Sequence, residues 1–355
     1  MVELAPGIAL NLYLLGALGM AVGLIAGFSG VSGGYMLTPI LMVMGMPAPL
    51  AVGSSVALMS ANNLIGVIRH RRMGHLDLKM GLITAAGTMG GAEIGVRILH
   101  GLQGTEGRVA DIVVLGVLIL TLVLVGGSML REVIRSSRTL GEDGQSAADE
   151  GEVHTAACDF LQGLTIFPHI RFTKSKLRIS AWFVLAVGMG IGVLSGFLGI
   201  GGGFMLCPAL IYLIGQPSTM AVGTNLLGLF VGLAFSTFRH GMLGNVELGV
   251  ALSMLVATGA GTFIGAKGTS HVKGLAVRYV LAASVVCAIF GPVCTLLYFL
   301  SGAGAWDTAA KILTIALMIV PVSAVVTLLI MARRRVRGLE VAPWAARLMA
   351  NGAQH

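Results

Sequence analysis

The sequence predicts an all-α polytopic membrane protein with an inverted-topology internal repeat and discontinuous or re-entrant Gly-rich helices. Three observations predict this fold class: the composition, a glycine-rich break that occurs twice, and an undersized apolar segment after each break. The chain of 355 residues is 56% hydrophobic and 11% charged, with a mean hydropathy of +0.91. Soluble domains carry about 25% charged residues, so this composition indicates a chain that lies mostly within a bilayer.

Apolar segments long enough to enter or span a membrane cover most of the chain. We expect helices at residues 8–28, 33–46, 48–68, 78–98, 109–130, 180–199, 203–215, 220–238, 247–266, 276–300 and 306–332. Within the polar stretch, 136–152 has the composition of a disordered linker, and 167–180 alternates polar and apolar residues as a short surface hairpin does. The predicted domains are a first transmembrane repeat (1–130), a cytoplasmic loop (131–179), a second repeat (180–300), and an extra C-terminal transmembrane helix with a basic cytoplasmic tail (301–355).

The first break reads "AGFSGVSGGYMLTP" at residues 26–39, and the second reads "SGFLGIGGGFMLCP" at residues 195–208. Glycine tolerates the strained conformations that a tight turn inside a membrane needs. The segments after the breaks, 33–46 and 203–215, extend about 20 Å as helices, short of a hydrocarbon core of about 30 Å. We therefore expect each to be the returning half of a helical hairpin.

The two breaks belong to a longer duplication. A shift of 169 positions aligns their glycines, and a shift of 170 then aligns "PAPLAVGSS" (47–55) with "PSTMAVGTN" (217–225). The same register aligns "GHLDL" (74–78) with "GNVEL" (244–248). Each half has an odd number of membrane-entering segments, so the second half starts from the opposite side and the repeat is inverted, as in many secondary transporters.

The lysines and arginines predict the orientation. When the segments are threaded alternately, nineteen of the 23 fall in the loops 69–79, 131–178 and 267–278 and in the C-terminal tail. Basic loops stay on the cytoplasmic side, so we expect a multi-pass protein of the cell inner (plasma) membrane. Its long loop and C-terminus would be cytoplasmic and its N-terminus outside. The net charge of +8 therefore reflects topology and predicts no nucleic-acid partner.

The breaks also predict a binding site. Helices that begin near Gly33 and Gly202 leave unpaired N–H groups and a positive dipole end, which suit an anion. The candidate substrate-binding residues are Gly30, Ser32, Gly33, Gly34, Ser54, Ser55, Asn62, Gly199, Gly201, Gly202, Gly203, Thr224 and Asn225.

Other interpretations of these residues stay open. The glycines also suit close helix packing, and Asn62 also suits hydrogen bonding between helices. Ser54 and Ser55, and their counterparts Thr224 and Asn225, also suit capping of the helix that they open. Ser32 aligns with Gly201, one of three consecutive glycines in the second break. It therefore either adds a hydroxyl donor or makes the two hairpins unequal.

Charged residues near helix ends are candidates for charge coupling. Glu93 and Arg97 stand four apart, the favourable spacing for an ion pair, and Arg97 also suits an interfacial position. Arg239 and His240 lie on the side with few basic residues, where they would steer anions, and we expect the histidine to be solvated. Asp77 and Glu247 are interpreted as structural residues of a first helical turn. No spacing predicts a cofactor or a metal site.

The duplicated motifs carry a resemblance to a known family. "GFSGVSGG" and "GFLGIGGG", each leading to a proline, together with "AVGSS", "AVGTN", "GHLDL" and "GNVEL", resemble the signature of the TauE/SafE family of sulfite exporters and organosulfonate permeases. The resemblance covers about residues 15–100 and 185–270. It implies a permease that moves small anions such as sulfite, sulfoacetate or related sulfonates, often outward.

The predicted function is therefore a secondary transporter that exports or exchanges a small anion bound near the midplane. A passive anion channel built on the same hairpins is the alternative. An enzyme is not expected, because the sequence has no HExxH, G-x-S-x-G or Walker A motif. The expected partners are the lipid bilayer, the anion and a coupling proton, and the resemblance together with small-residue faces favours a homodimer.

Overall fold

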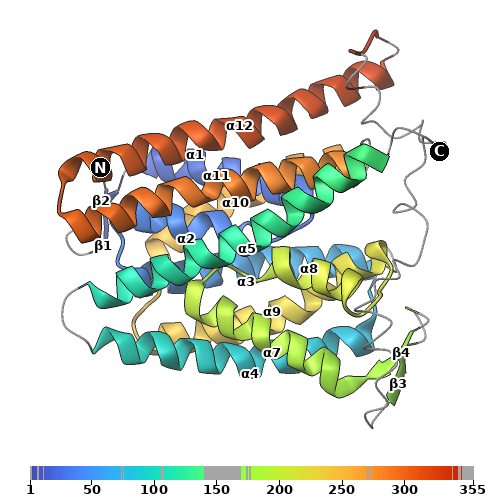
Figure 1. The fold of residues 1–355 in the computed structure, drawn as a ribbon, viewed down its shortest axis with the longest axis horizontal. Helices are drawn as coiled ribbons and strands as arrows, with labels where there is room; N and C mark the ends of the chain where they lie inside the picture. The colour runs from blue at the N-terminus through green and yellow to red at the C-terminus, as the bar shows by residue number, and fades with distance from the viewer. Residues whose placement is uncertain are drawn as a thin grey trace.

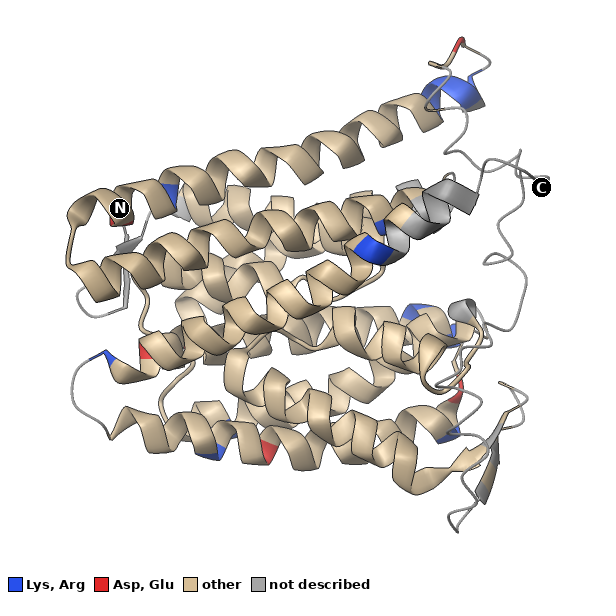
Figure 2. Ribbon diagram, in the orientation of Figure 1, with Lys and Arg blue, Asp and Glu red and all other residues tan. Residues whose placement is uncertain are grey.

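The computed structural model describes residues 2–5, 8–10, 12–72, 74, 76–104, 108–139, 169–172, 175, 177–269, 272, 274–337, 339–342 and 345. The helices run side by side along the long axis of the molecule (Figure 1). Within the described part of the chain, eight helices are long and apolar enough to cross a membrane. Charged residues gather mostly toward the two ends of the bundle (Figure 2). The chain is therefore an all-α, multi-pass membrane protein, as predicted.

Both sequence copies fold into the same order of helices. The first copy forms α1 (Leu12–Ser29), α2 (Gly34–Val43), α3 (Ala48–Arg72) and α4 (Leu78–Gln103). The second copy forms α7 (Ala181–Leu198), α8 (Gly203–Tyr212), α9 (Ser218–Met242) and α10 (Leu248–Thr269). Longer helices follow each copy, namely α5 (Val109–Thr139), then α11 (Gly274–Ser301) and α12 (Gly304–Val336). The undersized segments are helices of ten residues each, α2 and α8.

Differences from the expected boundaries are small. Helix α1 begins at Leu12 rather than near residue 8, because β2 (Ile8–Leu10) pairs with β1 (Val2–Ala5). Helix α5 continues past the apolar segment to Thr139. The short hairpin expected within 167–180 is confirmed as β3 (His169–Phe172) paired antiparallel with β4 (Leu177–Ser180). Most of the predicted linker at 136–152 lies outside the described residues.

The core is built on contacts between the two copies. Helix α4 packs most extensively on α7, and α1 on α10. A Cβ atom at Gly91 of α4 would collide with the carbonyl oxygen of Met189, and one at its counterpart Gly261 of α10 would collide with that of Met20. Glycines at these positions let the helix backbones touch, which is how small residues bring membrane helices together. Gly91 and Gly261 are therefore packing residues.

Candidate functional site

The two glycine-rich breaks, 30–33 before α2 and 199–202 before α8, contact each other. The Oγ atom of Ser32 donates to the carbonyl oxygen of Gly201 at 3.4 Å. A Cβ atom at Gly34 would lie 2.6 Å from the backbone of Ile200, and one at Gly203 would lie 2.6 Å from the Ser32 Oγ. The two breaks thus form one region where α2 and α8 begin.

The breaks differ in backbone conformation. The first has one glycine with positive φ, Gly30 at 67°. The second has three, at residues 199, 201 and 202, with φ between 64° and 72°. Only glycine adopts this left-handed region without strain, which explains the longer glycine run in the second copy. Ser32 takes the position of Gly201 in the first break, so the two breaks are unequal and Ser32 also contributes a hydroxyl donor.

Free N–H groups of α2 and α8 lie at the breaks. The N–H groups of Met36 and Leu37 donate to the carbonyl oxygen of Gly33, and those of Met205 and Leu206 donate to that of Gly202. Among the described residues, no acceptor is found for the N–H groups that come before these, at positions 33 and 34 or at 202 and 203. Each short helix therefore offers unpaired donors at its positive end.

Ser55 of α3 faces the second break. Its side chain is fully buried, and its Oγ atom has no hydrogen-bond partner among the described residues. Val52 and Met59 flank it on the same helix face, and their atoms lie 2.8 Å and 3.4 Å from the Cβ positions of Gly199 and Gly201. The hydroxyl group between them is therefore directed at the break.

Asn225 of α9 is the counterpart of Ser55. It is also fully buried, and neither its Oδ1 nor its Nδ2 has a partner among the described residues. Val222 and Leu229, on the same face of α9, contact the Cβ positions of Gly30 and Gly202 at 3.8 Å and 3.1 Å. An unsatisfied buried amide costs about 1–3 kcal/mol, so a water or a ligand is needed here.

Ser54 and Thr224 do not act as caps of the helices that they open, which was one of the two interpretations of these residues. Each lies in the second turn of its helix, because α3 and α9 begin near Pro47 and Pro217. The Ser54 Oγ accepts from the N–H of Glu247 at 3.0 Å, and the Thr224 Oγ1 accepts from that of Asp77 at 3.3 Å. Each hydroxyl group therefore accepts a hydrogen bond from the backbone at the start of a helix in the opposite copy, and neither caps its own helix.

Asp77 is the N-cap of α4, in agreement with the structural role expected for it. Its Oδ1 accepts from the N–H of Met80 at 3.2 Å, and its Oδ2 accepts from the Ser175 Oγ at 2.7 Å. The side chain of Gln216 donates to Ser175 and to Thr224 at 3.0 Å and 2.9 Å. This buried network ties the β3–β4 hairpin to α4 and α9.

Three further polar residues lie along the same helices. Asn62 is half-buried and its Oδ1 has no partner among the described residues, so no helix–helix hydrogen bond uses that atom. The sequence motifs did not mark Thr38, whose Oγ1 donates to the Gly199 carbonyl oxygen at 2.8 Å. They also did not mark Ser195, whose side chain is buried and unpartnered among the described residues, with its Cβ 3.8 Å from the Cβ position of Gly202. Ser195 stands beside the duplicated Gly196, which was the available signal.

The charged candidates form a cluster away from the breaks. Glu93 accepts from Arg97 Nε at 2.7 Å and from Arg239 Nε and Nη2 at 2.7 Å and 3.0 Å, which joins α4 to α9. The expectation of a solvated His240 is wrong, because its side chain is fully buried and Nε2 donates to the Gly196 carbonyl oxygen at 3.1 Å. Helix α9 continues to Met242 and keeps this histidine against α7.

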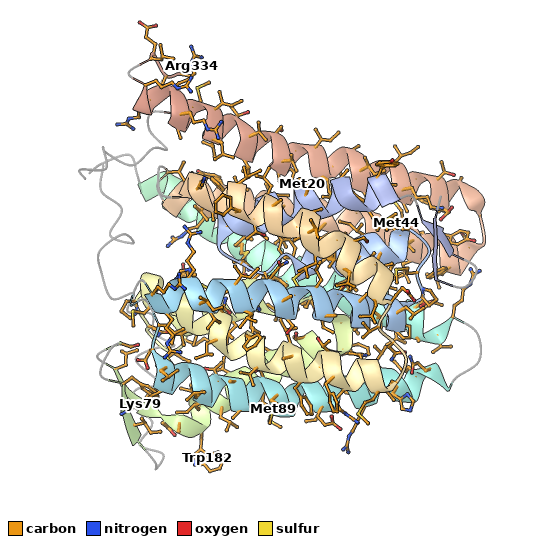
Figure 3. The ribbon with its side chains drawn as sticks, turned by 180° about the vertical axis from the view of Figure 1, so that it is seen from behind. Met20, Met44, Lys79, Met89, Trp182 and Arg334 are labelled. Carbon is orange, nitrogen blue, oxygen red and sulfur yellow. The ribbon has the colours of Figure 1, made fainter. Side chains whose placement is uncertain are left out.

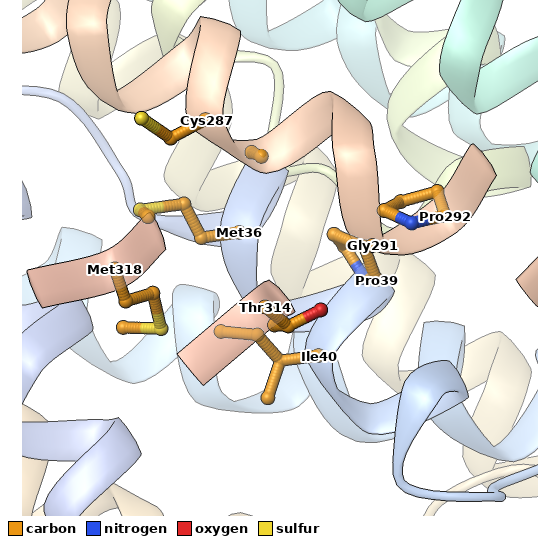
Figure 4. A pocket seen from close by; sticks show the side chains of 9 residues that line it. Met36, Pro39, Ile40, Cys287, Gly291, Pro292, Thr314 and Met318 are labelled. Atoms are coloured by element: carbon orange, nitrogen blue, oxygen red, sulfur yellow. The ribbon is translucent and has the colours of Figure 1, made fainter. Parts of the chain in front are cut away.

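A separate small pocket lies between α2, α11 and α12 (Figure 4). Met36, Pro39, Cys287, Pro292 and Thr314 are among the residues that line it. The lining is apolar apart from a thiol and a hydroxyl group, so it offers no charge complement to an anion. Among the described residues, no group of three His, Cys, Asp or Glu side chains is placed to hold a metal ion.

Comparison with known proteins adds the family context. The family model described as "Sulfite exporter TauE/SafE" matches residues 15–291, which include both breaks and both copies of the helices around them. "Probable membrane transporter protein YjnA" of Bacillus subtilis (strain 168) is 24% identical over 281 residues, covering 76% of this chain and 94% of the relative. No solved structure matches the chain.

Two further relatives carry the same description. "Probable membrane transporter protein" of Xylella fastidiosa (strain 9a5c) is 29% identical over 254 residues, covering 69% of this chain and 79% of the relative. "Probable membrane transporter protein YdhB" of Bacillus subtilis (strain 168) is 25% identical over 259 residues, covering 70% and 86%. The similarity therefore extends over most of each relative.

Proposed function

The chain belongs to the sulfite exporter TauE/SafE family, and we propose from that premise that it is a secondary transporter for a small anion bound between the two Gly-rich breaks. One observation carries the proposal. Ser55 and Asn225, at equivalent positions of the two copies, are fully buried and unpartnered, and both are directed at the region where α2 and α8 begin. Hydroxyl and amide donors beside free helix N–H groups suit an oxyanion.

The proposed architecture is an inverted repeat with two re-entrant hairpins. Helices α1 and α2 would form the hairpin that enters from one side, and α7 and α8 the hairpin that enters from the other. The ten-residue lengths of α2 and α8, about 15 Å, support this arrangement because neither helix can cross a bilayer alone. The anion would then lie near the midplane, where the two repeats of such transporters meet.

The proposed orientation places the long loop and the C-terminus in the cytoplasm, in the inner membrane of the cell. Lys79 and Arg334 lie at the same end of the bundle (Figure 3), which supports a common side for the loop before α4 and the C-terminal tail. Basic residues at one end favour the cytoplasm for that end. Export or exchange of sulfite or an organosulfonate is the transport reaction that the family name suggests.

The test is counterflow of labelled sulfite into proteoliposomes preloaded with unlabelled sulfite. We expect trans-stimulated uptake that falls about tenfold or more in Ser55→Ala and Asn225→Ala, because each loses a hydrogen bond to a charged ligand. Ser128→Ala is the matched control, since the Ser128 hydroxyl is exposed and donates only to its own helix at Val125. Unchanged uptake in folded Ser55→Ala and Asn225→Ala proteins would remove the breaks as the binding site.

A passive anion channel is the second candidate, because the same donors would also line a pore. The two functions differ in kinetics, since a carrier must return to the starting side and a channel need not. Uptake that depends on the internal anion indicates exchange. Sulfite flux that is independent of the preloaded anion would favour the channel.

A further inference from the structure

We propose that the site at the two breaks selects monovalent oxyanions and rejects divalent oxyanions of the same size. The inference rests on the proposed function and concerns the charge of the substrate, which the family name does not specify. It follows from the kinds of side chain that the protein buries at and around the breaks.

The groups available to an anion at the breaks are all neutral. The donors are the hydroxyl groups of Ser32, Ser55 and Ser195, the amide of Asn225, and the free N–H groups at the starts of α2 and α8. The atoms nearest to the Cβ positions of the break glycines also belong to neutral residues, such as Val222, Met59 and Leu229. The site therefore offers hydrogen bonds without a counter-charge.

No lysine or arginine among the described residues is buried. Of the acidic, basic and histidine side chains in this part of the chain, the buried ones are Asp77 and His240. His240 follows Asn225 by fifteen positions on α9, about 22 Å along the helix, and its Nε2 donates to the carbonyl oxygen of Gly196, three residues before the second break. Arg239, the residue before His240, is partly exposed and pairs with Glu93.

The buried carboxylate nearest to the breaks adds to the selectivity. The N–H of Asp77 donates to the Thr224 Oγ1 at 3.3 Å, so this residue lies beside the neighbour of Asn225. Its side chain accepts from the Ser175 hydroxyl at 2.7 Å and from the Met80 N–H at 3.2 Å. A negative charge there repels a doubly charged substrate about twice as strongly as a singly charged one at the same distance.

The cost of dehydrating an ion rises with the square of its charge, so a dianion costs about four times as much as a monoanion of the same radius. Neutral donors attract the dianion only about twice as strongly, because their interaction with an ion scales linearly with its charge. Without a buried cation, the extra cost of dehydrating the dianion is not compensated by its extra attraction to the site. The site therefore favours the singly charged species.

This selection assigns substrates by charge. Hydrogensulfite and simple alkanesulfonates are monoanions and fit the site. Sulfite in its doubly charged form, sulfate, thiosulfate and sulfoacetate are dianions and are rejected. Because hydrogensulfite loses its proton near neutral pH, sulfite transport would decline as the pH rises through that range.

The decisive experiment uses methanesulfonate and sulfate, which differ mainly by a methyl group in place of a charged oxygen. Each is added as a competitor of labelled sulfite uptake by the wild-type protein in proteoliposomes. We expect methanesulfonate to inhibit at a concentration at least about a hundredfold lower than sulfate. Inhibition by sulfate within about tenfold of methanesulfonate would overturn the charge selection and leave anion transport in place.

A pH series tests the same inference independently. Labelled sulfite uptake is expected to fall about tenfold per pH unit above the second ionisation of sulfite, because the hydrogensulfite fraction falls at that rate. Labelled methanesulfonate stays monovalent, so its uptake controls for titration of the protein and is expected to stay constant. A constant sulfite uptake would overturn the inference, and an absence of flux with both anions would overturn the proposed function itself.

Discussion

Arg239 and Arg69 occupy the same position in the two copies, but their surroundings differ. Arg239 donates twice to Glu93 of α4, with distances of 2.7 Å and 3.0 Å, and Glu93 also accepts from Arg97. In the other copy, Phe263 takes the place of the glutamate, and the ammonium group of Lys267 lies 4.4 Å from the ring centroid. Arg69 is exposed and makes no ion pair with the described residues.

The packing between helices also differs between the two copies. Helix α4 packs on α9 more extensively than α10 packs on α3, although the four helices are related by the duplication. The glycine contacts of α4 with α7 and of α1 with α10 are, in contrast, closely alike. The copies have therefore kept the packing that holds the helices together and diverged in the contacts that fix one end of the bundle.

The strongest way to break the shared packing is to add side chains at its glycines. We expect Gly91→Val and Gly261→Val each to destabilise the protein by more than about 3 kcal/mol, because the new Cβ would overlap a carbonyl oxygen of the facing helix. Gly90→Val and Gly259→Val are the matched controls, since a Cβ at either position meets nothing within 4 Å. The yield of monodisperse protein and its Tm in detergent measure the effect. Equal behaviour of all four variants would contradict the packing argument.

A second pair of counterparts contrasts the starts of α4 and α10. Asp77→Ala is expected to cost about 2–3 kcal/mol, because it leaves the buried Ser175 and Met80 donors without their acceptor. Glu247→Ala is expected to cost no more than about 0.5 kcal/mol, since the Glu247 carboxylate is half-exposed and has no partner among the described residues. Thermal unfolding of the two variants side by side is the measurement. A larger loss of stability in Glu247→Ala than in Asp77→Ala would contradict this prediction.

Glu93→Gln tests the ion-pair cluster directly. The expected cost is about 1 kcal/mol, because the pair with Arg239 is bidentate but both side chains are partly exposed, at 27% and 22%. High salt is expected to lower the Tm of the wild type toward that of the variant, since it screens this pair. A Tm that responds to salt equally in both proteins would show that the cluster adds nothing to stability.

Arg97→Met should have the smallest effect, about 0.3–0.5 kcal/mol, because the Arg97 side chain is 73% exposed and pairs with Glu93 along one helix. Lys267→Met serves as its counterpart in the other copy, where a cation–π contact of about 0.5 kcal/mol is lost. Chemical unfolding in a mild detergent can resolve changes of this size. A loss above about 1 kcal/mol for Arg97→Met would make this arginine a partner equal to Arg239.

Much of the fold could be predicted from the sequence, because apolar length and glycine breaks are local signals. Residues 33–46 and 203–215 were correctly predicted as short helices, and the hairpin within 167–180 was confirmed. Unequal hairpins were one of two interpretations of Ser32, and the glycines of the two breaks do differ in backbone conformation.

The partners of individual side chains could not be predicted, because they depend on how the helices are rotated against each other. Ser54 and Thr224 suited capping of their own helices, yet each accepts from a backbone N–H of the opposite copy. His240 looked solvated near a helix end, and the extension of α9 buries it. Ser195 was missed because its counterpart, Ala26, has no polar atom to mark the position.

The reciprocal hydrogen bonds of Ser54 and Thr224 have a consequence for biogenesis. The Asp77 N–H finds its acceptor 147 positions later in the chain, and Ser54 finds its donor 193 positions later. A ribosome delivers the first copy to the membrane well before either partner exists. During that interval the Asp77 N–H and the Ser54 hydroxyl lack these partners. The start of α4 therefore takes its final contacts only after α9 has been synthesised, and a chain stopped after α5 is expected to be less stable than the full chain.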